Sequence, residues 1–187
     1  MKPLKARKRT KEVSVNKTAY KDILSQLISF ALLFILSLCI VNYIGQGTKV
    51  IGRSMESTFM EGDSLFIDKL SYRFTNPERF DIVVFPFEEG ENTVLYIKRV
   101  IGLPGETIQI AGDHIYINGE ILSEEFGKEA MEEGSEGIAL YPYTLGEDEY
   151  FVLGDNRNLS IDSRQPQVGA IKKDMIIGKY AFRLWPF

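Results

Sequence analysis

The longest apolar run of the chain covers residues 23–44, where 22 consecutive positions carry no charged side chain. A helix of this length extends roughly 33 Å, at about 1.5 Å per residue, and is long enough to cross the hydrocarbon core of a bilayer. A buried core helix or a cleavable signal peptide can produce the same pattern. The run is longer than the apolar region of a cleavable signal and no Ala-x-Ala sequence follows it, which favours an uncleaved transmembrane signal-anchor helix.

Beyond residue 45 the pattern changes to short runs rich in β-branched and aromatic residues. These predicted strands are residues 64–70, 81–87, 93–101, 107–110, 114–117, 120–122, 150–153 and 175–185. Asn118-Gly119 separates two of the runs and is a strong hairpin signal. No amphipathic helical pattern of useful length is present in this region, and the connections are short. The sequence therefore predicts a mostly β domain with antiparallel sheets.

This pattern divides the chain into a basic tail (residues 1–22), the transmembrane helix (23–44) and a β-rich domain (45–187). The last part has 143 residues, enough for one domain with its own core. It contains a small insert at about residues 107–149. Within the insert, residues 123–146 are rich in Glu, Gly and Tyr and lack periodicity, so we expect a surface excursion whose acidic side chains face solvent.

Charge is distributed unevenly, with a net charge of +6 before Ile23 and −10 in the remainder. A basic tail beside an acidic domain can indicate nucleic acid as a partner. Here the tail directly adjoins an apolar helix, which favours topology as the explanation: a cytoplasmic tail and an extracytoplasmic domain. The single cysteine, Cys39, lies inside the apolar run, so the β-rich domain has no disulfide and no cysteine metal site. We expect neither a metal nor another cofactor, and no nucleic-acid partner.

The single histidine, His114, lies beside a turn and outside every polar motif. A Ser-His-Asp arrangement is therefore disfavoured, and a buried lysine is the other common way to activate a serine. Lys98 fits because it interrupts an apolar strand. Alternation places Tyr96 and Lys98 on one face and Arg99 on the other, so we expect Lys98 to lie among apolar neighbours while Arg99 reaches solvent. The alternative is a lysine with a buried stem and a hydrated ammonium group.

Residues 154–164 form a dense polar run directly after an apolar strand. Such density costs free energy unless the groups satisfy one another. The run predicts a turn-rich loop held by Asp–Arg pairs, in which Asp162 and Arg164 support the site and Ser160 faces the lysine.

Three blocks occur in order behind the apolar run. They are Ser54-Met55-Glu56-Ser57-Thr58, the block from Tyr96 to Glu106, and the block from Gly154 to Arg164. Together they resemble the bacterial type I signal peptidases, the membrane-bound Ser-Lys endopeptidases that release exported proteins. The resemblance covers the anchor and almost all of the β-rich domain, and it implies the antiparallel β fold of that family.

The resemblance assigns Ser54 as nucleophile and Lys98 as general base. The amine must be neutral to act, and burial lowers the pKa of a lysine because it penalises the charged form. The matching position implies that Ser160 hydrogen-bonds the lysine nitrogen and orients it. Asp155 and Arg157, with Asp162 and Arg164, match supporting positions, and Arg99 is interpreted as structural.

Substrate and oxyanion contacts are also implied by the resemblance. The family recognises small residues at the first and third positions before the cut, and Met55, Tyr96 and Ile97 match the positions that line those pockets; ordinary core packing is the alternative. The backbone N–H of Ser54 is the natural oxyanion donor. Some family members add a hydroxyl two residues earlier, where this chain has Gly52 and no side chain can help.

Three positions depart from the family pattern. Ser57 replaces the usual proline, and its loss is expected to loosen the turn after Ser54. Phe59 replaces the common leucine and is expected to narrow the pocket for the residue before the cut. Phe80 stands where glycine often precedes Asp81. We expect these changes to alter substrate preference and rate rather than the reaction.

The implied partners are signal peptides of exported preproteins, the lipid bilayer and the secretion translocon. The implied location is the bacterial plasma membrane, with a single span and a cytoplasmic N-terminus. Two alternatives stay open: a Ser-Lys peptidase dedicated to a narrow set of envelope, pilin or conjugation substrates, and a non-catalytic membrane-tethered β-domain. A self-cleaving repressor is disfavoured because 22 residues before the apolar run are too few for a DNA-binding module.

Overall fold

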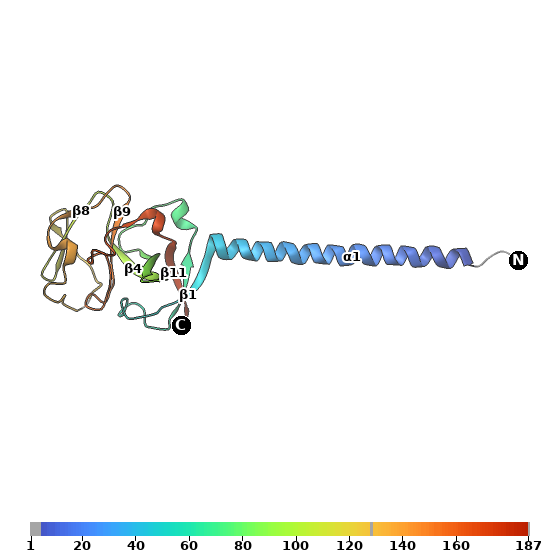
Figure 1. Ribbon diagram of the computed structural model, residues 1–187, viewed down its shortest axis with the longest axis horizontal. Coiled ribbons are helices and arrows are strands. Elements are labelled where there is room, and N and C mark those ends of the chain that lie inside the picture. Colours follow the sequence, from blue (N-terminus) through green and yellow to red (C-terminus); the bar gives the residue numbers. More distant parts are fainter. Residues whose placement is uncertain (1–4, 128, 187) are drawn as a thin grey trace. The chain divides into compact units, whose positions relative to one another are not determined.

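The computed structural model of the protein describes residues 5–127 and 129–186, and these form two compact units, Met1–Tyr43 and Ile44–Phe187. The described part of the first unit is one long helix, α1 (Lys5–Cys39), followed by a π-helical segment, Ile40–Ile44, whose last residue is the first of the second unit (Figure 1). The part from Ala19 to Ile44 is long and apolar enough to cross a membrane, with a mean hydropathy of 2.5. The helix therefore includes the predicted run but begins far before it, because most of the preceding charged residues are good helix formers.

Two hydroxyl side chains of the apolar helix donate to backbone carbonyl groups of the same helix. Ser29 Oγ donates to the carbonyl oxygen of Ser25 at 3.0 Å, and Ser37 Oγ donates to that of Phe34 at 2.8 Å. Hydroxyl groups bonded to their own helix need no water. This helix is thus compatible with a hydrocarbon surrounding.

The second unit consists of two antiparallel sheets (Figure 1). The larger sheet has the order β1-β2-β11-β3-β4-β9-β10. Its strands are β1 (Gly45–Lys49), β2 (Ser64–Asp68), β3 (Ile82–Glu89), β4 (Asn92–Gly102), β9 (Glu149–Leu153), β10 (Ile171–Lys172) and β11 (Gly178–Trp185). The smaller sheet has the order β7-β6-β5-β8, formed by β5 (Thr107–Ala111), β6 (His114–Ile117), β7 (Glu120–Ile121) and β8 (Tyr143–Thr144). The predicted mostly β, antiparallel fold is confirmed.

Three strands were not predicted from the sequence, and each has a weak pattern. β1 reads GQGTK, and β8 and β10 have two residues each, too short for alternation to be recognised. The predicted Asn118-Gly119 hairpin is present: Ile117 pairs with Glu120, and both turn residues have positive φ.

The strand β3 is buried on both faces, which explains its continuous apolar sequence. Ile82 and Val84 pack in a core with Met55 and Leu65, on the side of the Ser54 segment. Val83 and Phe85 pack in a second core, with side chains of β4, β9 and β10. Core side chains therefore pack on both faces of the sheet at β3, the strand that pairs with β4.

The insert is more ordered than its sequence predicts. Residues 123–146 contain a 3₁₀ helix, Gly137–Leu140, and the strand β8. Ala139 and Leu145 are buried in a third core between β5, β6 and β9. The prediction that its acidic side chains all face solvent is wrong for Glu124, whose carboxylate binds Arg157. Two further 3₁₀ helices, Ser71–Arg73 and Lys173–Met175, lie in connections.

Candidate active site

Ser54 and Lys98 meet in the structure although 44 positions separate them. Lys98 lies on β4 opposite Val83, and its side chain is only 3% exposed. Lys98 Nζ donates to Ser54 Oγ at 2.9 Å and to the carbonyl oxygen of Ile97 at 3.1 Å. A hydroxyl and an amine at this distance are placed for direct proton transfer.

Burial lowers the pKa of the Lys98 ammonium group to about 8, because the charged form loses its hydration. The carboxylates of Asp162, Asp155 and Glu89 act in the opposite direction but are weaker than the burial effect. The ammonium nitrogen lies 4.6 Å from the centre of the Tyr96 ring. The lysine therefore carries a much larger neutral fraction near neutral pH than a lysine in water.

The turn that carries Ser54 is fixed by its neighbours. Asn156 donates its backbone N–H to the carbonyl oxygen of Ser54 at 3.0 Å, and the carbonyl oxygen of Met55 accepts from Thr58 and Phe59 at 3.0 and 2.8 Å. Within the described part of the chain, the N–H of Ser54 donates to no protein group. This donor is thus available to an oxyanion formed at the serine.

Gly52 begins the turn with φ +84°, a conformation that favours glycine. A Cβ added there would meet nothing within 4 Å. This position, two residues before Ser54, therefore has room for a small side chain, but its backbone conformation disfavours one.

Arg99, next to the lysine, is 5% exposed, so the expectation that it reaches solvent is wrong. Its Nε and Nη2 donate to the two carboxylate oxygens of Asp155 at 2.8 and 2.6 Å, and its Nη1 donates to the carbonyl oxygen of Phe80 at 2.9 Å. Thr58 Oγ1 donates to Asp155 at 2.5 Å. A bidentate partner and added hydrogen bonds make burial of the charge tolerable.

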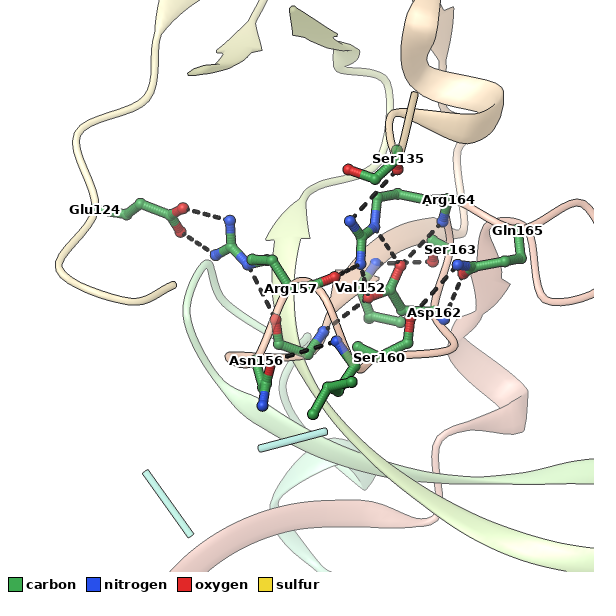
Figure 2. Close-up of polar contacts among 12 residues, drawn as sticks. Glu124, Ser135, Val152, Asn156, Arg157, Ser160, Asp162, Ser163, Arg164 and Gln165 are labelled. Atoms are coloured by element: carbon green, nitrogen blue, oxygen red, sulfur yellow. Dashed lines mark hydrogen bonds and ion pairs between the residues drawn. The ribbon is translucent and has the colours of Figure 1, made fainter. Parts of the chain in front are cut away.

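Figure 2 shows the polar contacts of the predicted loop, with Arg157 directed toward Glu124 and Arg164 bonded to Asp162. Arg164 donates from Nε and Nη2 to the two oxygens of Asp162 at 2.9 and 3.0 Å. Arg157 donates from Nε to the carbonyl oxygen of Gly154 at 3.0 Å, and Asp162 accepts from the N–H of Gly154 at 3.1 Å. The pairing of Asp162 with Arg164 is an Asp–Arg pair within the loop, as predicted. For Asp155 and Arg157, the partners are Arg99 and Glu124, which lie outside the loop.

Ser160 does not make the expected hydrogen bond to Lys98. Its Oγ is buried and has no hydrogen-bond partner among the described residues. The side chain nevertheless lies at the site, because a Cβ built on Gly154 would come within 2.2 Å of Ser160 Oγ and 2.5 Å of the carbonyl oxygen of Ser54. The hydroxyl is thus close to the reacting groups without a partner of its own.

A groove of about 610 Å³ lies along the serine and the lysine. One wall is residues 48–55, which end in Ser54 and Met55, and the other is residues 93–98 of β4 with Tyr96 and Ile97. All three residues predicted to line the substrate pockets are therefore in the groove. Met55 and Ile97 also belong to a buried core, so the groove role and the packing role coexist.

Of the three positions that depart from the family pattern, two have an unusual backbone conformation and the third is buried in the core. Phe59 is 2% exposed, packs against Tyr180, and is not among the groove residues, so the expectation that it directly narrows the pocket is wrong. Ser57 has φ +84° and Phe80 has φ +72°. Proline cannot adopt the first of these, whereas glycine would suit the second.

Sequence reasoning missed three contributors to the site. In the sequence, Thr58 stands out only as part of a motif, whereas in the structure it contacts both Asp155 and Arg99. Glu124 and Phe126 belong to the insert and contact the buried arginines. Long-range pairs of this kind leave no local pattern in the sequence.

Comparison with known proteins gives consistent matches. The family model described as "Signal peptidase, peptidase S26" matches residues 23–185. Signal peptidase I V of Bacillus subtilis is 38% identical over 153 residues, which cover 77% of this chain and 88% of that protein. A probable signal peptidase I-2 of Synechocystis is 35% identical over 158 residues, covering 81% and 68%. A crystal structure of a signal peptidase I from Enterococcus faecalis is 37% identical and covers 57% of this chain and 98% of that one, with a TM-score of 0.45.

Proposed function

The chain belongs to the signal peptidase family, peptidase S26, and from that premise we propose that it is a membrane-anchored serine endopeptidase that removes signal peptides from exported preproteins. The observation that carries the proposal is the 2.9 Å contact between Lys98 Nζ and Ser54 Oγ in a groove. Both reacting residues stand on segments that the surrounding core holds in place.

In the first step neutral Lys98 accepts the proton of Ser54 Oγ while Oγ attacks the carbonyl carbon before the cut. The resulting oxyanion receives a hydrogen bond from the backbone N–H of Ser54. Collapse of this intermediate breaks the peptide bond, and the Lys98 ammonium group gives its proton to the leaving amine. The signal peptide is then esterified to Ser54.

In the second step Lys98 is neutral again and accepts a proton from water, which attacks the ester. The bond to Ser54 Oγ breaks, the proton returns to Oγ, and the signal peptide leaves with a free carboxylate. Lysine therefore acts as base and acid in turn, which requires a pKa close to the working pH. Burial of Lys98 supplies this condition.

The substrate binds as an extended strand along β4. β9 pairs with β4 only at Arg99, Val100 and Gly102. On that side of β4, no described strand pairs with residues 92–98, so this part of the strand is an open edge. A peptide in the groove adds main-chain hydrogen bonds to this edge. Met55, Tyr96 and Ile97 then limit the side chains at the first and third positions before the cut to small ones.

Membrane attachment brings the site to its substrate. The span from Ala19 to Ile44 anchors the chain, with a cytoplasmic basic tail and an extracytoplasmic β-rich domain. In the second unit, the apolar side chains of Phe74, Leu184 and Trp185 are 82%, 39% and 62% exposed, and we assign them to contact with lipid. The translocon is the partner that delivers the preprotein.

The test is cleavage of a preprotein with an Ala-x-Ala site by the detergent-solubilised chain. Wild type should cut at that site, and Ser54→Ala and Lys98→Ala should be inactive while keeping the melting temperature of a folded protein. Ser123→Ala and Lys172→Ala, which change exposed residues of the same types, are the controls. Failure of folded wild type on several such preproteins would turn the assignment to a dedicated processing peptidase or a tethered binding domain.

Orientation has its own test because the chain contains one cysteine, in the span. In a Cys39→Ala background, Glu91→Cys places a thiol at an exposed turn of the β-rich domain. A membrane-impermeant thiol reagent should label it in intact cells. Labelling only after the cells are broken would place the domain on the cytoplasmic side.

A further inference from the structure

Residues 124–127, here named the strap, belong to the segment between β7 and the 3₁₀ helix of the insert and lie outside the groove. Three of the four strap residues contact the two buried arginines beside the active site. Glu124 is an ion-pair partner of Arg157, the Phe126 ring lies against the guanidinium group of Arg99, and Gly127 lies against that of Arg157. Such a concentration of contacts in four residues needs an explanation.

The contact of Glu124 is bidentate and nearly dry. Its carboxylate oxygens accept from Arg157 Nη1 at 2.7 Å and Nη2 at 2.8 Å, and the side chains are 12% and 2% exposed. Figure 2 shows Glu124 approaching Arg157 from a separate segment of chain, on the side away from Asp162. No other carboxylate pairs with Arg157 among the described residues, so Glu124 alone neutralises this buried charge.

Gly127 has φ +70° and lies directly against the same guanidinium group. A Cβ at this position would come within 2.8 Å of Arg157 Cζ. The strap therefore holds the arginine both through charge and through a close approach that other residue types do not permit.

Phe126 restrains the second buried arginine, Arg99, through its aromatic ring. Its ring centre lies 3.5 Å from Arg99 Cζ and 5.3 Å from the ring centre of Phe80. A cation over an aromatic face, shielded from water, is an attractive contact. It confines the guanidinium group that holds Asp155.

The two arginines transmit this restraint to the reacting serine. Arg157 holds the carbonyl oxygen of Gly154, whose Cα is packed against Ser160 and the carbonyl oxygen of Ser54. Arg99 holds Asp155, and the next residue, Asn156, donates its N–H to Ser54. Three successive residues, Gly154 to Asn156, thus lie between the strap contacts and the nucleophile.

We infer that Glu124, Phe126 and Gly127 are positioning residues of the Ser-Lys site: they clamp Arg157 and Arg99 and thereby fix the loop against which Ser54 rests. The inference rests on the proposed function. None of the three lines the groove, so they act on placement of the nucleophile and not on binding of the peptide.

The test measures kcat and KM separately on a signal-peptide substrate, at a temperature where all variants are folded by circular dichroism. Glu124→Gln removes the charge with little change in shape, and Glu125→Gln makes the same change at the exposed neighbour. Glu124→Gln and Phe126→Leu should lose about tenfold or more in kcat with KM within about twofold of wild type, as expected for a misplaced reacting group. Glu125→Gln should match wild type.

Gly127→Ala extends the test to backbone placement and should lose kcat in the same way. Where Glu124→Gln does not fold, Phe126→Leu decides alone. Wild-type kcat in folded Glu124→Gln, Phe126→Leu and Gly127→Ala, with only a lower melting temperature, overturns the inference, as does a loss confined to KM. Cleavage by wild type is measured in parallel, so absence of activity there contradicts the proposed function instead.

Discussion

Lys98 and Arg99 are consecutive residues of β4 and are both almost fully buried, but within the described part of the chain only Arg99 contacts a carboxylate. Asp155 takes the guanidinium group with two hydrogen bonds. Lys98 instead contacts a hydroxyl and a backbone carbonyl. The same strand thus keeps one cation charged and makes the neutral form of the other accessible, because desolvation without a paired carboxylate favours the amine.

The pH dependence of cleavage should follow from this difference. Since the neutral amine is the reactive form and the pKa of Lys98 is lowered to about 8, kcat/KM should rise with pH and level off above about pH 8. Lys98→Arg should be inactive at every pH because a guanidinium group does not deprotonate in proteins. A profile that is flat between about pH 6 and pH 9 would contradict the assignment of Lys98 as base.

Stability should depend on pH in the same region. Below pH 8 the lysine is charged in both the folded and unfolded states, and the folded state bears the full desolvation cost. Between pH 8 and 10.5 the unfolded chain binds the proton and the folded one does not, so stability rises with pH, by about 3 kcal/mol. Denaturant unfolding of wild type and Lys98→Met at both ends of this range measures the difference. If the free energy of unfolding changed equally with pH in the two proteins, Lys98 would not be the cause of the pH dependence.

Ser160→Ala should separate stability from activity. The hydroxyl is buried without a partner, so removing it should leave the melting temperature unchanged or raise it. If the hydroxyl engages Lys98 during the reaction, kcat falls by about tenfold to a hundredfold all the same. Cleavage rates with thermal unfolding check this, and Ser123→Ala is the exposed control. Unchanged kcat would remove Ser160 from the reaction.

Gly52→Ser tests whether the oxyanion lacks a side-chain donor. The added hydroxyl has room, but φ +84° costs any side chain about 1 kcal/mol. Gly52→Ala bears the same backbone cost without the hydroxyl and is the matched control. We expect the serine variant to exceed the alanine variant several-fold in kcat. Equal kcat for the two would indicate that the backbone donor suffices.

Ser57→Pro should destabilise the domain although proline is usual at this position in the family. Proline fixes φ near −65°, and Ser57 has φ +84°, so the turn after Ser54 must be rebuilt at a cost of about 3 kcal/mol. Ser57→Gly should instead be neutral or stabilising because glycine adopts this conformation freely. Thermal unfolding measures both. A proline variant as stable as wild type would mean that the turn adopts another conformation in solution.

The parts of the site that the sequence could predict are those encoded within one strand or one motif. Interruption of an apolar strand located Lys98, and alternation correctly placed Tyr96 with it and Arg99 opposite. Alternation does not report what covers the second face. Arg99 was expected in solvent because Asp155, its partner, lies 56 residues further along the chain.

The sequence predicted which residues form the site better than it predicted their backbone conformation. Ser57 and Phe80 were recognised as departures from the family pattern, but nothing local shows that both have positive φ. The insert was read by composition as a surface excursion, because a few buried residues such as Ala139 and Leu145 give no periodic pattern. In each case tertiary packing decided the conformation over local preference.

The open edge of β4 also has a consequence for release of the cleaved signal peptide. In the proposed binding mode, a preprotein on residues 92–98 is held through the part before the cut, and hydrolysis breaks none of the main-chain hydrogen bonds to that part. The mature protein departs with the leaving amine, whereas the spent signal peptide keeps its hold on the strand. In this binding mode, turnover depends on how quickly the spent signal peptide leaves β4, because a peptide that stays bound occupies the groove needed by the next preprotein.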